Sequence, residues 1–293
     1  MTPFPWRSLL YVPVHEERFV ARAAQRGADA IVLDLEDGVP EHAKDRAGEA
    51  IAAAVPRVGG GGAAVLVRVD GRWRRAWRDL ERAVTAGVAA VMLPKVRDAG
   101  SVAVVSAYLA ELEHDMGRAV GATGLIALIE DAAGLLAARA IAAVPRVWAL
   151  LPGNLDLALD LGVGQGSDVF AATHARLLID ARAEGKAFIG TLGGGAEIRD
   201  LEAFRRAVER ARAFGSEAVT CVHPAQIDVV HEVFAPDPVA LAEAERIVAA
   251  YDEAGGGAVA VDGAMVDRPV AERARALLMR ARGPGRSVGG SGS

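Results

Sequence analysis

The stretch GLIALIEDAAG, residues 124–134, contains the pattern that decides the fold. It begins with a short unbroken apolar run, which is typical of a strand buried on both faces of a parallel sheet. Two carboxylates, Glu130 and Asp131, come directly after this run, and an alanine-rich segment that suits a helix follows them. The stretch therefore predicts a β-strand and then an α-helix, with acidic side chains at the carboxyl end of the strand.

The same order of apolar run and helical stretch recurs along the chain. The eight candidate strands are Ser8–Val14, Asp29–Leu35, Ala63–Val69, Ala89–Leu93, Gly124–Ile129, Arg146–Leu151, Ala187–Ile189 and Glu217–Val222. Helical periodicity marks the segments between them, as in Glu16–Arg26, Glu41–Ala54 and Leu201–Phe214. This alternation predicts βα units around a parallel sheet, either closed or open. The count of strands and a length of 293 residues favour a TIM (β/α)8 barrel, which needs about 250 residues.

The last part of the chain does not continue the repeat. Residues 1–232 are expected to form the barrel, and residues 233–282 a C-terminal helical extension. Within the extension, the helix expected at Leu241–Tyr251 is broken by the glycines at 255–257, which could act as the hinge of a lid. The glycine- and serine-rich residues 283–293 predict a disordered tail.

Composition excludes several classes of protein. Hydrophobic residues make up 52% of the chain, aromatic residues only 5%, and the net charge is −5, so a nucleic-acid partner is not expected. The single cysteine, Cys221, cannot form an intramolecular disulfide and is expected to be inert core. No signal peptide and no uncharged apolar stretch of the roughly 20 residues that a membrane helix needs can be found. We therefore expect a cytoplasmic protein without a membrane partner.

Polar and charged residues follow most of the candidate strands. They are Asp34, Glu36 and Asp37 after the second run, Arg68 and Asp70 after the third, Lys95 after the fourth, Glu130 and Asp131 after the fifth, Gly153, Asn154 and Asp156 after the sixth, and His223 after the eighth. Catalytic groups of a TIM barrel lie at the carboxyl ends of its strands, so these side chains are expected on one rim. Polar loops begin at the ends of strands in any barrel, so each of these residues could instead belong to an ordinary loop. For His223 in particular, we expect such a structural role.

Two of these carboxylates are candidate metal ligands. Glu130 and Asp156 each follow an apolar run, and a carboxylate at the mouth of such a site is unfavourable unless it is paired or bound to a metal. Oxygen ligands suit Mg²⁺, whereas no cysteine pair or HxxxH pattern suggests zinc. The alternative is that both carboxylates form salt bridges with Arg68 or Lys95. Arg68 itself could grip a substrate carboxylate, or could pair with Glu36 or Asp37.

Several motifs, in order along the chain, resemble one known family. The matching stretches are RSLLYVP at residues 7–13, LDLEDGV at 33–39, VRVD at 67–70, LPKV at 93–96, LIEDAAG at 128–134, DLALDLG at 156–162, HPAQI at 223–227 and GAMVD at 263–267. On these residues the chain resembles the citrate lyase β-subunit-like branch of the HpcH/HpaI aldolase superfamily, from Arg7 to about Ala281. Each motif alone is weak, but the ordered set is specific.

The resemblance implies a TIM barrel in homotrimers or hexamers that binds Mg²⁺ through Glu130 and Asp156. It implies that Arg68 grips the carboxylate of an α-keto acid, and that Asp267, on a segment that can cover a neighbouring subunit's site, is the catalytic acid or base. The implied reaction is the reversible cleavage of a 3-hydroxyacyl-CoA, of the malyl-CoA or citramalyl-CoA type, to an acyl-CoA and an α-keto acid. Gly153 and Asn154 are then expected at the substrate.

The remaining side chains of the rim, Glu36, Asp37 and Lys95, are expected to support the site. Other positions depart from the family pattern, which leaves the substrate open; they are Val14, His15, Asp70, Asp131, Leu155 and Gly190. Three other functions stay possible: a citrate lyase β subunit acting on citryl-ACP, an aldolase on free hydroxy-keto acids, and a non-catalytic barrel that binds an acyl-CoA or keto acid.

Overall fold

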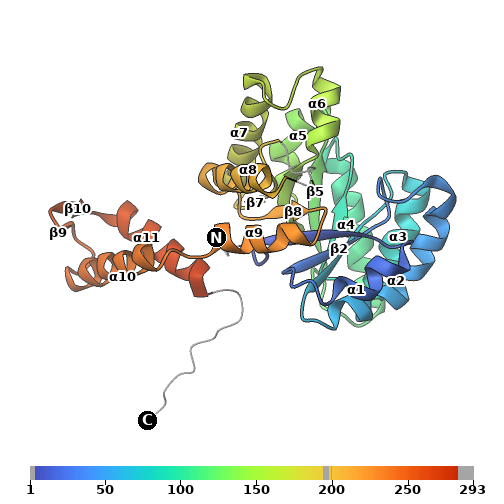
Figure 1. Cartoon of the computed structure of the whole chain (residues 1–293), viewed down its shortest axis with the longest axis horizontal. Coiled ribbons are helices and arrows are strands. Elements are labelled where there is room, and N and C mark those ends of the chain that lie inside the picture. Colours follow the sequence, from blue (N-terminus) through green and yellow to red (C-terminus); the bar gives the residue numbers. More distant parts are fainter. Residues whose placement is uncertain (1–3, 194–197, 199, 283–293) are drawn as a thin grey trace, which may run out of the picture. The chain divides into compact units, whose positions relative to one another are not determined.

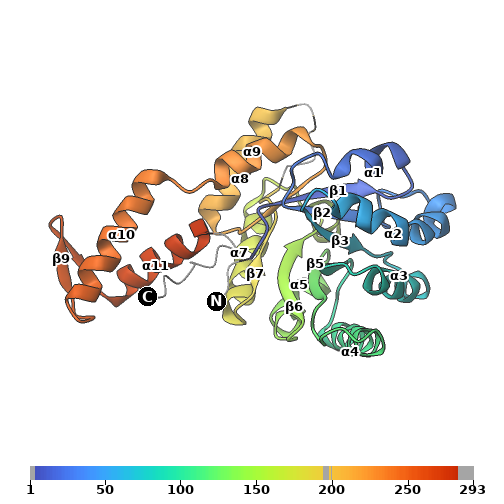
Figure 2. The same ribbon diagram turned by 90° about the horizontal axis from the view of Figure 1, so that it is seen from below.

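The computed structural model describes residues 4–193, 198 and 200–282, and its main feature is one eight-stranded parallel sheet (Figures 1 and 2). The order of the strands in the sheet is β7-β6-β5-β4-β3-β2-β1-β8. Their bounds are β1 Ser8–Pro13, β2 Ala30–Asp34, β3 Ala64–Arg68, β4 Ala90–Leu93, β5 Gly124–Ile129, β6 Val147–Pro152, β7 Ala187–Phe188 and β8 Val219–Cys221.

The order of the strands decides between the closed and the open arrangement. Neighbours in the sheet are neighbours in the sequence, and β8 pairs with β1, whereas an open doubly wound sheet reverses its order at a switch point. At the other end of the sheet, the Glu217 amide donates to the Phe188 carbonyl at 3.0 Å, and the Gly190 amide to the Ala218 carbonyl at 2.7 Å. The TIM-barrel-like fold predicted from the sequence is therefore confirmed.

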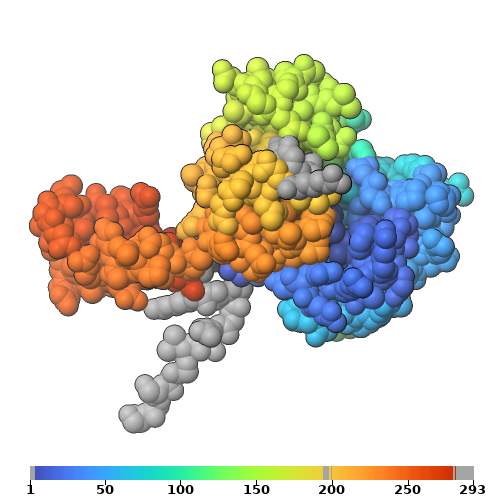
Figure 3. Space-filling view, in the orientation of Figure 1, coloured from blue at the N-terminus to red at the C-terminus, as the bar shows by residue number. Residues whose placement is uncertain are grey.

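Helices cover the outside of the sheet, because each has one apolar face. In α8, for example, Phe204, Ala207, Val208 and Ala211 are buried at helical spacing. The first three helices pack side by side, α1 against α2 and α2 against α3, and this part of the chain forms the blue surface in Figure 3. The helices of this unit are α1 Glu17–Ala23, α2 Lys44–Gly59 after the 3-10 turn Glu41–Ala43, α3 Trp73–Thr85, α4 Ala99–Asp115, α5 Ala132–Ala142, α6 Asn154–Leu161, α7 Asp168–Ala183, α8 Leu201–Phe214 and α9 Ala225–Phe234.

The strands supply the core, and they agree with the apolar runs to within one or two residues at each end. Every residue of β2 and β5 is buried, as expected for a sheet covered on both sides. The seventh strand is shorter than predicted, since Ile189 follows the strand rather than extending it. Cys221 is buried in β8, and burial raises the pKa of its thiol to about 12, so it is a core residue.

Among the described residues, 234–282 form a second compact unit. It consists of α10 (Pro238–Glu253), an antiparallel hairpin of β9 (Val259–Val261) and β10 (Ala264–Val266), and α11 (Arg268–Arg282). Tyr251, Val266 and Ala271 form its small core. The tail predicted to be disordered, residues 283–293, lies outside the described residues. Within the described part of the chain, no helix combines the length and apolarity needed to cross a membrane.

Candidate active site

The carboxyl ends of β2 and β3 bring an arginine and an aspartate together. Asp34 and Arg68 are the last residues of these strands and lie opposite each other in the register. Arg68 donates two parallel hydrogen bonds to the Asp34 carboxylate, from Nε at 2.7 Å and from Nη2 at 2.8 Å. The same carboxylate accepts from the amides of Glu36 and Gly38, at 3.0 and 2.9 Å. Asp34 therefore fixes both the guanidinium and the loop after β2.

Glu36 links this pair to Lys95. Its Oε2 lies 3.1 Å from Arg68 Nη1, and its Oε1 accepts from Lys95 Nζ at 2.6 Å. Burial raises the pKa of Glu36, and the hydrogen bond from Lys95 and the charge of Arg68 oppose that shift. Asp37 is exposed and lies farther away, 3.7 Å from the arginine and 3.9 Å from the lysine. The sequence left open whether Arg68 pairs with Glu36 or Asp37, and both ion pairs are present. The best-aligned partner of Arg68, however, is Asp34.

Lys95 lies in an unusual backbone conformation. Its φ of 55° is in the left-handed region, which residues with a β-carbon rarely adopt. This conformation lets its amide donate to Glu130 Oε2 at 2.7 Å while its ammonium reaches Glu36. Lys95 therefore connects the two buried glutamates of the rim, one through the backbone and one through the side chain.

Glu130, directly after β5, is a buried carboxylate with 5% exposure. Burial, and next the charge of Glu36, raise its pKa to about 7; the Lys95 amide opposes this shift, and the charge of Asp156 adds to it. Gly153 packs against this side chain so closely that a β-carbon there would lie 2.4 Å from Glu130 Cγ and 2.8 Å from Oε1. Only glycine fits at this position, and it lets the Glu130 side chain pack directly against the backbone at the start of α6.

Asp156 lies in the first turn of α6, and buried polar contacts of Asn154 fix the start of this helix. Asn154 Nδ2 donates to the Thr191 carbonyl at 3.0 Å, and Asn154 Oδ1 lies 2.9 Å from His174 Nε2. His174 is fully buried, and its Nδ1 lies 2.9 Å from the Phe170 carbonyl. Burial lowers the pKa of His174, whereas the carbonyls of Phe170 and Thr191 raise it. The amide of Asn154 is thus engaged in fixing the start of α6.

The residues present fit a magnesium ion better than a transition metal. Among the described residues, no group of three or more His, Cys, Asp or Glu side chains is placed to hold a metal. Mg²⁺ needs only one or two carboxylates, since waters and substrate oxygens complete its shell. The Glu130 carboxylate is buried, and the charges of Glu36 and Asp156 help to raise its pKa, so it has the chemistry of such a ligand. The sequence left open whether Glu130 and Asp156 form salt bridges with Arg68 or Lys95. Neither carboxylate does so, because the side chain of Arg68 binds Asp34 and that of Lys95 binds Glu36.

Several polar residues near the rim have structural partners. Asp70 pairs with Lys44 at 3.0 Å, and Lys44 also donates to the carbonyls of Leu35 and Glu36 at 2.9 and 2.8 Å. Asp131 caps α5 through the Gly134 amide. His223 Nδ1 accepts from the Ala225 amide at 3.2 Å.

Sequence reasoning missed three residues that shape the site. They are Lys44, His174 and Tyr11, whose ring centroid lies 4.8 Å from the Arg68 guanidinium. Asp34 was expected on the rim, but not as the partner of Arg68; aligning the ends of the second and third apolar runs places the two opposite each other. The contacts of the other three depend on tertiary packing, which periodicity does not reveal.

Asp267 belongs to the second unit, between β10 and α11. Its Oδ1 accepts from the Val270 amide at 3.3 Å, so it caps the start of α11. An aspartate that caps a helix start remains partly free to accept or donate a proton through its other oxygen.

The fold and the rim define a TIM-barrel-like α/β protein in which Arg68, Asp34 and Glu36 form a cluster of low exposure that the exposed Lys95 joins, beside the carboxylates of Glu130 and Asp156. The family model described as HpcH/HpaI aldolase/citrate lyase matches residues 7–224. The chain therefore belongs to the HpcH/HpaI aldolase/citrate lyase family, as the ordered motifs implied.

Characterised relatives match over nearly the whole chain. A (3S)-malyl-CoA thioesterase of Cereibacter sphaeroides is 35% identical, over 94% of this chain and 95% of its own. A citrate lyase subunit beta of Leuconostoc mesenteroides is 32% identical, over 93% and 92%. A solved structure, CitE from Mycobacterium tuberculosis in complex with magnesium, acetoacetate and coenzyme A, is 31% identical with a TM-score of 0.72 and covers 94% of this chain and 98% of its own.

Proposed function

We propose that this chain is a Mg²⁺-dependent carbon–carbon lyase that reversibly cleaves a 3-hydroxyacyl-CoA, of the malyl-CoA or citramalyl-CoA type, to an acyl-CoA and an α-keto acid. The observation that carries the proposal is the guanidinium of Arg68, fixed by Asp34 and Glu36 on the same rim as the buried Glu130. The relatives named for malyl-CoA and citrate lyase chemistry, and the magnesium and coenzyme A bound to CitE, support it.

Arg68 binds the carboxylate of the keto acid in this proposal. Two of the guanidinium groups of Arg68, Nε and Nη2, each donate one hydrogen bond to Asp34, whereas Nη1 is held near Glu36 Oε2 by an ion pair at 3.1 Å. The N–H groups of Nη1 and the second N–H of Nη2 are left to grip a carboxylate. Because Asp34 and Glu36 hold the group rigidly, little conformational entropy is lost when the substrate binds.

Glu130 and Asp156 are the residues that would hold Mg²⁺. When bound, the ion supplies a Lewis acid that polarises the keto oxygen of the substrate. The backbone of Gly153 and Asn154 forms the wall beside this position, and Glu36, Asp37 and Lys95 set the local charge. The carboxylates around this position outnumber the positive charges of Arg68 and Lys95. The net charge of the site is therefore negative, which favours the binding of a divalent cation.

Asp267 is the acid or base at the α-carbon of the acyl thioester in this proposal. In the cleavage direction it returns a proton to the acyl carbon after the C–C bond breaks, and in the reverse direction it removes one. We propose that the segment carrying it covers the site of a neighbouring chain, so that the working form is a homotrimer or hexamer.

The decisive assay offers the purified protein malyl-CoA, citramalyl-CoA and citryl-ACP, with and without Mg²⁺. We expect Mg²⁺-dependent release of an acyl-CoA together with glyoxylate or pyruvate. Turnover of citryl-ACP alone would assign the chain as a citrate lyase β subunit, and aldol cleavage of free hydroxy-keto acids alone would assign it to an aldolase. Binding of these ligands without any turnover would leave a non-catalytic barrel and contradict the proposal.

A second candidate activity is favoured by the 35% identical malyl-CoA thioesterase. Hydrolysis of the thioester would release free CoA and intact malate, whereas lyase activity releases an acyl-CoA and glyoxylate. Measuring free thiol and keto acid in the same reaction therefore separates the two activities.

A further inference from the structure

A hollow lined by arginines lies between α2 and the start of α3, outside the candidate site. Its volume is about 350 Å³. One water molecule in the liquid occupies about 30 Å³, so the hollow has room for roughly ten atoms of that size. The residues that line this arginine hollow are Asp45, Arg72, Arg74, Arg75 and Arg78.

Two of these arginines are anchored by carboxylates. Arg72 pairs with Glu41 and with Asp70, whose Oδ1 lies 3.3 Å from Arg72 Nε. Arg75 Nη1 lies 2.9 Å from Glu41 Oε1, and Arg75 Nε lies 3.5 Å from Asp45 Oδ1. These ion pairs restrict both guanidinium groups to the wall of the hollow, so less conformational entropy is lost when a ligand binds there.

The other two arginines, Arg74 and Arg78, have no counter-charge. Both are exposed, and among the described residues neither side chain forms an ion pair or a hydrogen bond. They are four residues apart on one helix, and like charges at this spacing destabilise a helix. The fold therefore gains nothing from this pair, whereas a bound anion would relieve its repulsion.

The start of α3 adds to this unfavourable arrangement of charge. The N-terminal end of a helix carries a partial positive charge, which acidic side chains normally offset. The first turn of α3 contains no acidic residue, and no side-chain hydrogen bond from Arg72 caps it. Arg74 and Arg75 lie in this turn instead. The positive end of the helix and the guanidinium groups of the hollow thus favour the same kind of ligand, an anion.

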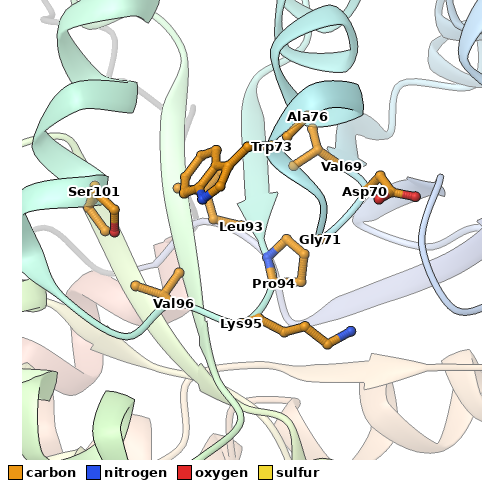
Figure 4. A pocket seen from close by; sticks show the side chains of 11 residues that line it. Val69, Asp70, Gly71, Trp73, Ala76, Leu93, Pro94, Lys95, Val96 and Ser101 are labelled. Atoms are coloured by element: carbon orange, nitrogen blue, oxygen red, sulfur yellow. The ribbon is translucent and has the colours of Figure 1, made fainter.

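The charge of the arginine hollow is positive even when the carboxylates beside it are counted. The carboxylates that pair with its arginines are Glu41, Asp45 and Asp70. Lys44 Nζ lies 3.0 Å from Asp70 Oδ2, and Figure 4 shows the Asp70 carboxylate directed away from the ring of Trp73. Four arginines and one lysine therefore face three carboxylates, which leaves an excess of two positive charges in a chain whose net charge is −5.

We propose that the arginine hollow is a binding site for a phosphate or diphosphate group. Guanidinium groups donate parallel hydrogen bonds to phosphate oxygens, and the N-terminal end of a helix binds the same anion. The excess of two positive charges matches a phosphate dianion better than a singly charged carboxylate. The volume of the hollow also admits a diphosphate, which has nine heavy atoms.

Two sources carry this chemistry. Only residues 69–72 separate the carboxyl end of β3 from the start of α3, so the hollow lies at the same end of the barrel as the candidate site. The first source is the CoA part of the substrate, which has a diphosphate and a 3′-phosphate; this assignment rests on the lyase function proposed above. The second is a separate small phosphate ligand, which is independent of that function.

The test uses the double variant Arg74→Gln/Arg78→Gln. The matched control is Arg206→Gln/Arg210→Gln, which removes two exposed arginines at the same spacing from α8. Glutamine is about as good a helix former as arginine, so both variants should fold. Each protein is titrated calorimetrically with pyrophosphate and with CoA in Mg²⁺-free buffer. We expect the wild type and the control to bind pyrophosphate, and the Arg74/Arg78 variant to bind it at least about tenfold more weakly, because charge-assisted contacts are lost.

The CoA titration identifies the source. Weaker binding of CoA by the Arg74/Arg78 variant assigns the hollow to the substrate, and the KM for the thioester should then rise while kcat stays constant. Weaker binding of pyrophosphate with unchanged binding of CoA assigns it to a separate phosphate ligand.

Two results would overturn the arginine hollow, whether or not the protein cleaves a thioester. In one, the Arg74/Arg78 variant binds both probes as tightly as the control does, and in the other the wild type binds neither probe. Conversely, a protein that cleaves no thioester but shows the expected difference with pyrophosphate retains the hollow and loses the lyase function.

Discussion

The Asp34 carboxylate and the Arg68 guanidinium form a two-hydrogen-bond fork, at 2.7 and 2.8 Å, between the last residues of two adjacent strands. Because parallel strands end on one rim, the fork fixes the arginine at the place where substrates of TIM barrels bind. The other end of β2 has a similar fork, in which Arg7 donates to Asp29 from Nε at 2.8 Å and from Nη2 at 2.9 Å. The same ion-pair chemistry therefore occurs on both faces of the barrel, and only one of them carries the candidate site.

This pairing gives a matched experiment. We expect Asp34→Asn to lower kcat/KM for the thioester by about 10- to 100-fold, because losing a charge-assisted bond of about 1.5–3 kcal/mol frees the guanidinium to move. Asp29→Asn removes an equivalent carboxylate off the rim and should reduce stability without affecting kcat/KM. Steady-state kinetics and chemical denaturation of both variants separate the two effects. Equal kinetic losses in the two variants would contradict the assignment of Arg68.

Glu130 and Asp156 give a second prediction. Glu130→Gln and Asp156→Asn are each expected to weaken Mg²⁺ binding, measured by isothermal titration, whereas Asp160→Asn on the same helix as Asp156 should not. Because the pKa of Glu130 is about 7 and Mg²⁺ binds the carboxylate, affinity should fall as the pH drops below 7, and binding at pH 6 should release a proton. Unchanged affinity in Glu130→Gln would exclude it as a ligand.

Much of the fold follows from the sequence, because it depends on local pattern. The strand Gly124–Ile129 and the helix Leu201–Phe214 have the bounds that their apolar periodicity predicts. The partners within the rim are harder to predict, since they depend on register and backbone conformation. The left-handed φ of Lys95, which connects it to Glu130, has no signal in a residue that is not glycine.

Asn154 tests how far the site depends on buried polar contacts. Asn154→Ala removes the buried hydrogen bonds that Asn154 makes to the Thr191 carbonyl and to His174 Nε2, so we expect the free energy of unfolding to fall by about 1–3 kcal/mol. Mg²⁺ binding should weaken as well, because the start of α6 is loosened, while KM for the keto acid at saturating Mg²⁺ stays nearly constant. His174→Phe should act in the same direction. A raised KM with unchanged stability would instead assign the Asn154 side chain to the substrate.

Asp79 predicts a pH dependence of stability. Its carboxylate is 5% exposed, and burial raises its pKa from 3.8 to about 6. The folded state therefore holds this proton more tightly than the unfolded state, so the contribution to stability is present at low pH and is lost as the pH rises through about 6. We expect Asp79→Asn to gain roughly 2–3 kcal/mol relative to the wild type between pH 4 and pH 8, from urea unfolding at each pH. Parallel stability curves for the two proteins would contradict the raised pKa.

Asp267 can be tested for both its role and its location. Asp267→Asn keeps the oxygen that accepts from the Val270 amide, so the second unit should stay folded and Mg²⁺ binding should be unaffected. Exchange of the acyl-CoA α-proton with solvent, followed by NMR, should be lost if this carboxylate is the base. If the residue serves a neighbouring chain, mixing inactive Asp267→Asn with inactive Arg68→Ala subunits will restore activity, because some sites then combine a native Asp267 with a native Arg68. Two folded variants that exchange subunits but recover no activity would place both groups in the same chain.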